Sequence, residues 1–383
     1  MVEAKSSQNP ALRLEASSRG AAVLDLPEEV PATPVHPAPS VAGSRPKKKL
    51  IRRRQADRSQ ALRRAFQVAF LLLNLWIGVE FYLFVRHYEL GGTGPYPSRP
   101  GGIAGWLPIA GLMNLKYFLL TGVVPKIHAP AMYLLVAFLL VSLAWSKSFC
   151  SWLCPVGTLS EALWKAGRKL FKRNWRLPRW LDLPLRSLKY LLLALFLYAV
   201  GSMPPAAIAA FMQGPYGLVA DVKMLNFFRY LSQTAAVVIV ALVVLSIFIQ
   251  NFWCRYLCPY GALMGLAAVF SPAKIRRNAE VCIDCAKCAK ACPALLPVDN
   301  RAVIRSLECT SCLECVAVCP AQGALHFGGS RRKALAPRWV AAGIAAVFLA
   351  IVIYAKWAGH WESPIPDELN RQLIPRAQEF GHP

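Results

Sequence analysis

Five runs of apolar residues divide this chain and limit its possible folds more than any other feature. They lie at residues 65–85, 131–145, 188–203, 235–252 and 339–355. Each approaches the ~20 apolar residues that a helix needs to cross the core of a bilayer. A helix satisfies its own backbone hydrogen bonds there, which a single strand or loop cannot do. We therefore predict a membrane all-α bundle of about five transmembrane helices, one for each run.

The basic residues indicate how such a bundle is oriented. A net charge of +24 would suggest a nucleic-acid partner in a soluble protein. Here Lys and Arg gather at residues 47–64, 165–179 and 331–333, whereas residues 86–126 and 211–233 contain few of them. Basic loops of membrane proteins face the cytoplasm. We therefore predict a multi-pass protein of the cell inner membrane with a cytoplasmic N-terminus, a periplasmic C-terminal tail and no nucleic-acid partner.

The cysteines follow two patterns, and the first is a repeated run of Cys-x2-Cys-x2-Cys-x3-Cys-Pro that ends at Pro293 and again at Pro320. Bacterial ferredoxins bind [4Fe–4S] clusters with this run, and the fourth cysteine of each run ligates the other cluster. The pattern assigns Cys282, Cys285, Cys288 and Cys319 to cluster 1, and Cys309, Cys312, Cys315 and Cys292 to cluster 2. The predicted module is a small α+β, two-cluster ferredoxin domain inserted in the bundle.

Two zinc sites are the main alternative for these eight cysteines, because Cys-x2-Cys pairs also occur in zinc ribbons. Zinc motifs seldom add a third cysteine after a second two-residue gap and a fourth before proline, twice in succession. Disulfides are disfavoured because the runs are predicted to face the reducing cytoplasm. We therefore expect two [4Fe–4S] clusters that transfer electrons.

The second cysteine pattern is an internal repeat of Cys-x3-Cys-Pro, at residues 149–159 and 253–263. Both copies follow an apolar run at its predicted cytoplasmic end, so we expect the two pairs to meet. Their four thiols could form a further Fe–S or other metal site, act as redox thiols that handle copper, or only fill space as buried cysteines. The residues concerned are Cys150, Cys154, Cys254 and Cys258.

The combination of paired Cys-x3-Cys-Pro helices and a double ferredoxin run resembles the membrane polyferredoxins of the NapH and NosR type. The resemblance covers roughly residues 63–335. It implies electron transfer between membrane quinol, cytoplasmic clusters and a redox partner, often periplasmic. The chain departs from the regulator type because a basic segment stands in place of an N-terminal flavin-binding domain.

Polar residues in or near the apolar runs are candidates for a quinone site. Glu80 could accept a proton from quinol, or pair with Arg86 at the interface. Asn114 and Lys116 could contact a quinone headgroup, although a lysine extending to the interface explains Lys116 as well.

These observations divide the chain into four parts. We predict a disordered basic cytoplasmic region (1–62), a transmembrane core (63–270), the ferredoxin domain (271–333), and a last helix with an external tail (334–383). The predicted function is electron transfer from the quinol pool through two clusters to a redox partner, and a role as a quinol dehydrogenase subunit is left open. Cofactor maturation with copper reduction, or redox sensing, are the alternatives.

Overall fold

The computed structural model describes residues 50–53, 57–93, 96–330 and 334–382. Most of the segment predicted to be disordered lies outside these residues. Residues 50–53 pack against the ferredoxin module. Arg53 N donates to Pro320 O (3.1 Å), and Gln322 N donates to Ile51 O (2.9 Å). The first helix, α1 (Ser59–Glu89), also begins within the predicted N-terminal region.

Helices that could cross a membrane are fewer than the sequence predicts. Three are long and apolar enough among the described residues: α1, α6 (Arg179–Ser202) and α14 (Pro337–Trp357). A fourth crossing forms if α9 (Ala220–Arg229) and α10 (Gln233–Phe248) act as one span, although they are bent by 80° at their junction. The described residues therefore give three to four candidate spans, and the predicted five are not confirmed.

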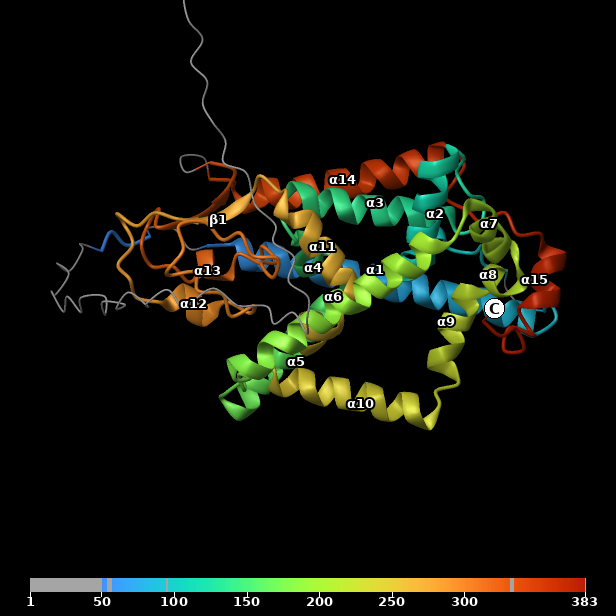
Figure 1. Cartoon of the computed structure of the whole chain (residues 1–383), viewed down its shortest axis with the longest axis horizontal. Coiled ribbons are helices and arrows are strands. Elements are labelled where there is room, and N and C mark those ends of the chain that lie inside the picture. The colour runs from blue at the N-terminus through green and yellow to red at the C-terminus, as the bar shows by residue number, and fades with distance from the viewer. Residues whose placement is uncertain (1–49, 54–56, 94–95, 331–333, 383) are drawn as a thin grey trace, which may run out of the picture. The chain divides into compact units, whose positions relative to one another are not determined.

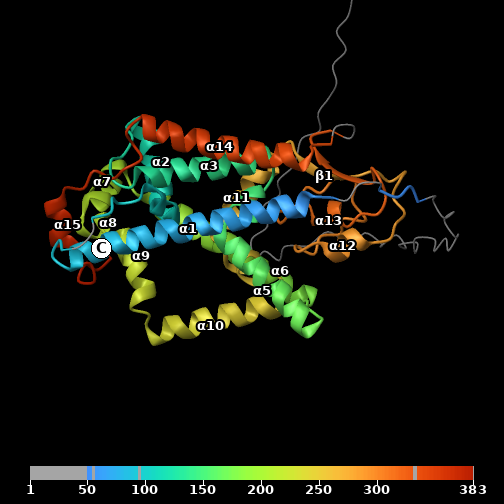
Figure 2. The same ribbon diagram turned by 180° about the vertical axis from the view of Figure 1, so that it is seen from behind.

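The remaining apolar run forms α3 (Ala129–Ala144), which has 16 residues and lies in the middle of the bundle. Helices α2 (Pro108–Thr121), α11 (Pro259–Val269) and α14 pack against it. Figures 1 and 2 show α3 and α14 running side by side. Because α3 is covered by protein and most of its apolar residues are buried, its short length does not expose backbone to lipid.

The ferredoxin module combines a two-stranded antiparallel sheet with two one-turn helices. Its elements are β1 (Lys274–Arg277), α12 (Lys287–Ala291), α13 (Glu314–Ala317) and β2 (Leu325–Gly328). Ile275 pairs with Phe327 in the sheet, and both side chains are buried. The sheet therefore joins the two ends of the module and leaves the two cysteine runs between its strands.

The other elements lie between the long helices or in the C-terminal tail, and all except the 17-residue α5 are short. They are η1 (Gly101–Trp106), α4 (Ser148–Trp152), α5 (Pro155–Phe171), α7 (Pro205–Gln213), α8 (Pro215–Leu218), the π-helical turn η2 (Trp253–Leu257) and α15 (Asp367–Leu373). Helix α15 lies in the C-terminal tail, where Asp367 accepts hydrogen bonds from Tyr88 (2.8 Å) and Tyr96 (3.2 Å). The tail is therefore attached to the end of α1.

Lys116 and Asn114, candidates for a quinone headgroup site, serve the fold instead. The Lys116 ammonium donates to the carbonyl oxygens of Val200 (3.0 Å), Gly201 (2.7 Å) and Met203 (2.6 Å). The last carbonyls of a helix lack partners within it, so Lys116 caps the end of α6. The Asn114 amide donates to the carbonyl of His128 (3.1 Å) and holds the start of α3.

Candidate iron–sulfur sites

The eight ferredoxin cysteines line two separate cavities. Cys282, Cys285, Cys288 and Cys319 line one, and Cys292, Cys309, Cys312 and Cys315 line the other. Each cavity thus takes three cysteines from one run and one from the other, which is the crossed arrangement expected from the sequence. The crossing arises at α12 and α13. Cys288 of α12 lines the first cavity and the following Cys292 lines the second, whereas Cys315 of α13 lines the second and the following Cys319 lines the first.

The loops around these cavities have the same unusual backbone in both runs. Asp284 and Ala286 have φ of 55° and 54°, and the equivalent Ser311 and Leu313 have φ of 50° and 59°. Residues other than glycine seldom adopt this left-handed conformation, and strain of this kind collects at functional sites. The repeated left-handed turns curl each loop so that its cysteines line one cavity. This geometry suits a group bound by several thiolates.

The four membrane cysteines, Cys150, Cys154, Cys254 and Cys258, line a third cavity of about 80 Å³. All twelve cysteines of the chain are free thiols. Within the described ranges, no three His, Cys, Asp or Glu side chains are arranged to hold a single metal ion. Four cysteines line each of the three cavities.

Both Cys-x3-Cys-Pro copies build this third cavity in the same way. Cys154 precedes Pro155 at the start of α5, and its sulfur accepts a hydrogen bond from Gly157 N (3.4 Å). Cys258 starts α11 similarly, and its sulfur accepts from Gly261 N (3.2 Å). Proline is well suited to the first turn of a helix because it has no N–H to satisfy there. N–H···S bonds of this kind are among the features that set the potential of an iron–sulfur cluster.

Charged residues that the sequence reasoning missed also line the third cavity. Lys147 is buried beside the cysteines, and Glu308 lies across from them and accepts two hydrogen bonds from Lys189 (2.5 and 2.6 Å). Burial raises the pKa of Cys150 to about 11 and that of Cys254 to about 12. Burial alone would lower the pKa of Lys147, but the nearby Cys150 and Glu308 raise it overall. A cation is therefore available to balance thiolates bound to iron.

The third cavity shares a wall with the second ferredoxin cavity. Pro293, Ala294, Thr310 and Cys312 line both. Cys312 is therefore a member of the ferredoxin run that also faces the membrane cysteines. This contact could not be read from the spacing of the motifs, because Cys312 and Cys258 are far apart in the sequence.

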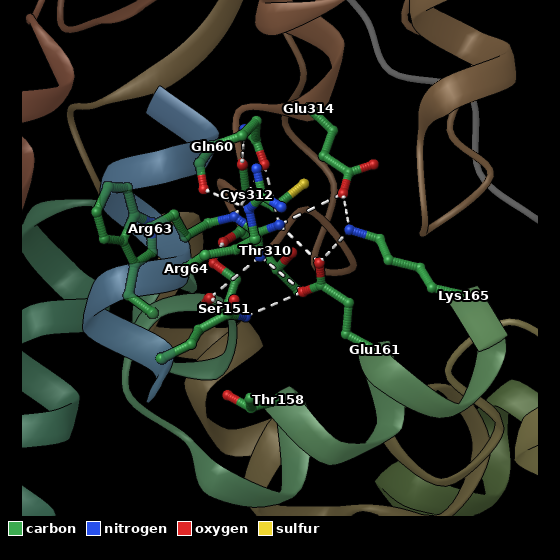
Figure 3. Close-up of polar contacts among 12 residues, drawn as sticks. Gln60, Arg63, Arg64, Ser151, Thr158, Glu161, Lys165, Thr310, Cys312 and Glu314 are labelled. Carbon is green, nitrogen blue, oxygen red and sulfur yellow. Dashed lines mark hydrogen bonds and ion pairs between the residues drawn. The ribbon is translucent and has the colours of Figure 1, made fainter. Parts of the chain in front are cut away.

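A buried ion-pair network fixes the ferredoxin module beside α1 and α5. Arg63 donates to both carboxylate oxygens of Glu161 (2.6 and 2.7 Å) and to Glu314 (3.3 Å). Lys165 bridges the same two carboxylates (2.5 and 2.6 Å), and Gln60 donates to the carbonyl of Cys312 (2.9 Å), as Figure 3 shows. The network therefore joins three elements directly beside the shared wall.

Glu80 lies in the wall of a larger cavity of about 620 Å³, between α1, α3 and α14. The predicted pairing of Glu80 with Arg86 is not formed, since Arg86 contacts Glu89 (3.7 Å). Cys154 and Cys258 line this cavity as well as the third cavity. An intramembrane carboxylate thus faces a space that reaches the membrane cysteines.

Comparison with known proteins places these features in a family. A family described as "4Fe-4S binding domain" matches residues 127–178 and 231–278, which contain the two Cys-x3-Cys-Pro copies. A "4Fe-4S dicluster domain" matches residues 274–320. The candidate electron transport protein YccM of Escherichia coli K12 is 51% identical over 326 residues, which are 84% of this chain and 91% of YccM. The chain belongs to the NapH/NosR-type membrane polyferredoxins.

Other polyferredoxins of this family match over shorter stretches. The regulatory protein NosR of Pseudomonas aeruginosa is 33% identical over 216 residues, 51% of this chain and 29% of NosR. The ferredoxin-type protein NapH of Escherichia coli K12 is 27% identical over 168 residues, 41% of this chain and 54% of NapH. No solved structure matches the chain.

Membership of this polyferredoxin family makes the chain a ferredoxin-type electron transport protein with iron–sulfur clusters. The matches also bear on the Cys-x3-Cys-Pro thiols. The family description that covers both copies is an iron–sulfur one, and the copper alternative has no support from either match.

Proposed function

We propose that the protein passes electrons from membrane quinol through three iron–sulfur centres to a redox partner. The two ferredoxin cavities would each hold a [4Fe–4S] cluster on the cysteines that line them, and the four membrane cysteines would hold a third. The proposal rests mainly on Cys312, which lies in the walls of both the third cavity and the second ferredoxin cavity. Neighbouring centres with a shared wall suit a short electron path.

The residues around the three cavities would bind and tune the clusters. A [4Fe–4S] cluster, when bound, accepts or donates one electron at a potential that its surroundings set. Backbone N–H groups of Gly157 and Gly261 point at cysteine sulfurs, and Arg277 Nε donates to Cys282 (3.2 Å). Donors to sulfur stabilise added negative charge, so they favour the reduced state.

The end of this path farthest from the quinol is the first ferredoxin cavity. Cys285 is exposed, and it lines the cavity farthest along the series from the membrane cysteines. A redox partner could approach there. We propose that this end lies in the cytoplasm and that α3 serves as a fifth crossing in the inner membrane. A periplasmic redox partner would then require other subunits of a larger oxidoreductase to return the electrons across the membrane.

Iron content and EPR of the anaerobically purified protein test the proposal. The wild type should hold about twelve irons per chain, four for each cubane. A variant with Cys150, Cys154, Cys254 and Cys258 changed to Ser should hold about eight and lose one EPR signal, because the ferredoxin cavities keep their ligands. A matched variant with Cys282 and Cys285 changed to Ser should lose a different signal. Full iron and unchanged spectra in the first variant would exclude a cluster at the membrane cysteines.

A further inference from the structure

We propose that the cavity of about 620 Å³ beside the membrane cysteines binds a lipophilic quinol, and that Glu80 accepts its protons. This inference rests on the proposed quinol-to-partner relay and assigns the site at which that relay begins. The cavity is called the quinol cavity below.

The position of the quinol cavity is the first reason. It lies between α1, η1, α3 and α14, and it shares Phe149, Cys154, Cys258 and Tyr260 with the third cavity. No further layer of protein stands between the two spaces at these residues. A ligand in the quinol cavity would therefore contact the side chains that are proposed to hold the first iron–sulfur centre.

The lining of the quinol cavity suits a flat aromatic ring with an apolar tail. Five of its rings touch in series from α1 to the cysteines: Phe70, Phe348, Phe138, Phe149 and Tyr260. The ring centroids of Phe138 and Phe149 are 4.0 Å apart and stacked. Apolar and aromatic walls with few polar groups are typical of sites for such ligands.

The quinol cavity also opens to the protein surface beside α1 and α14, two helices that can span a membrane. Leu73 and Trp76 on α1 are 43% and 71% exposed, and Leu349 on α14 is 52% exposed. On a membrane-spanning helix, exposed apolar residues face lipid chains. The opening would therefore admit a molecule dissolved in the bilayer and not a polar solute.

Polar and charged groups also line the quinol cavity, among them Glu80 on α1, Lys356 on α14 and Glu362 after α14. Asn74 and Glu80 both line the cavity from α1, and Trp106 Nε1 donates to Asn74 Oδ1 (3.0 Å). Arg99 also lines the cavity, and Asp221 neutralises it at 2.5 Å. A carboxylate inside a membrane segment is costly, and Arg86 is engaged by Glu89. Glu80 and Glu362 are the two carboxylates that line the cavity, and Glu80 is the one that lies within a helix able to span a membrane. We therefore assign proton uptake from a bound quinol to Glu80.

The reaction balances with these groups. Each quinol that becomes a quinone releases two electrons and two protons. The electrons would pass one at a time across the wall formed by Cys154 and Cys258 to one-electron iron–sulfur acceptors. Each proton would move from a quinol hydroxyl to the Glu80 carboxylate and then to water at the outer end of α1. Electrons and protons would leave in different directions.

Blocking the quinol cavity tests the site. Val352 lines the cavity from α14, whereas the next residue, Ile353, is 62% exposed on the outside of the helix. Photolabelling of the purified holoprotein with an azidoquinone should mark peptides of α1 and α14. We expect Val352→Trp to reduce labelling at least tenfold and Ile353→Trp to leave it unchanged, with equal iron content and dithionite-reduced EPR spectra in all three proteins.

Replacing the proton acceptor tests the role of Glu80. Glu80→Gln should leave azidoquinone labelling within twofold of the wild type but slow cluster reduction by a quinol at least tenfold. Glu368→Gln, on α15 outside the quinol cavity, is the matched control and should change neither. Equal reduction rates for Glu80→Gln and the wild type would overturn this role.

The same experiments separate the site from the function. If a quinol reduces the clusters of Val352→Trp as fast as those of the wild type, the assigned site is wrong and the relay stands. If dithionite reduces the wild-type clusters and no quinol does, the relay is wrong. Labelling that is lost only in Val352→Trp would then still support quinone binding in this cavity.

Discussion

Arg63 shows how a single residue can join distant parts of the chain. Its side chain is fully buried, and its charge is balanced by Glu161 and Glu314. From the sequence, Arg63 is one of several basic residues flanking the first apolar run. Its two partners lie 98 and 251 residues away, so no local pattern reveals the pairing.

Neutralising Glu161 should destabilise the protein in a pH-dependent way. Burial alone would raise the pKa of Glu161, but hydrogen bonds from Arg63 and Lys165 lower it to about 2 from an ordinary 4.5. That difference corresponds to stabilisation on the order of 3 kcal/mol at neutral pH. Because the folded-state pKa is lowered, this contribution is fully present above about pH 4.5 and is lost as the pH falls toward about 2.

Denaturant unfolding in detergent, followed by circular dichroism, measures this effect. The gap in unfolding free energy between the wild type and Glu161→Gln should be constant at pH 6 and 7 and should narrow below about pH 4.5. Glu379→Gln, which alters an exposed pair with Arg376, should show no gap. A gap that does not depend on pH would mean that the ion pair is not its origin.

The cysteines could be predicted from the sequence better than their surroundings could. Spacing alone predicts how the eight ferredoxin cysteines divide between two sites, because the runs bring three thiols together locally. The left-handed turns at Asp284 and Ser311 could not be foreseen, since neither position is a glycine. The capping role of Lys116 could not be foreseen either, because the carbonyls that it caps belong to the apolar run at 188–203 and no local pattern links them to Lys116.

At the scale of helices, close approach of backbones determines which elements pack. Helix α5 lies against α10, and Gly167 is the point of contact. A Cβ atom at residue 167 would lie 2.0 Å from the carbonyl oxygen of Ile247. The main chain of α10 therefore requires a residue without a side chain at this position.

Gly167→Ala should destabilise the protein by about 1–3 kcal/mol, the usual range for overpacking a tight contact. Gly201 in α6 is the matched control, because a Cβ atom there has no neighbour within 4 Å. Alanine favours helix over glycine by up to about 1 kcal/mol, so Gly201→Ala should be neutral or stabilising. Thermal unfolding of the two variants in the same detergent checks both expectations.

The break between α9 and α10 explains why counting helices from hydropathy was unreliable. The apolar run at 235–252 predicts one straight span. The structure starts α10 at Gln233, where Ser232 caps the helix by accepting from Ala235 N (3.2 Å), and bends it by 80° from α9. The capping serine marks the start of α10, but the direction of α9 depends on packing that hydropathy does not contain.

For the whole molecule, the number of crossings decides where the tail lies. With a cytoplasmic N-terminus, five crossings place the tail outside the cytoplasm and four place it inside. Alkaline phosphatase, which is active only outside, should therefore be active when fused after His382 and inactive when fused after Lys172. An inactive fusion after His382, with normal expression, would reduce the number of crossings to an even one.

The crossed cysteines also determine when the protein can be completed during its synthesis. Each ferredoxin cavity needs a residue from both runs, so the first cannot close until Cys319 has been made. By then α1, α3, α6 and α10 have all left the ribosome, and α14 is the one candidate membrane-spanning helix of the described residues still to be made. Cofactor insertion must therefore follow most of membrane insertion. A chain stalled before Cys319 would already be embedded in the bilayer, with three of the four cysteines of the first ferredoxin site and all four of the second already made.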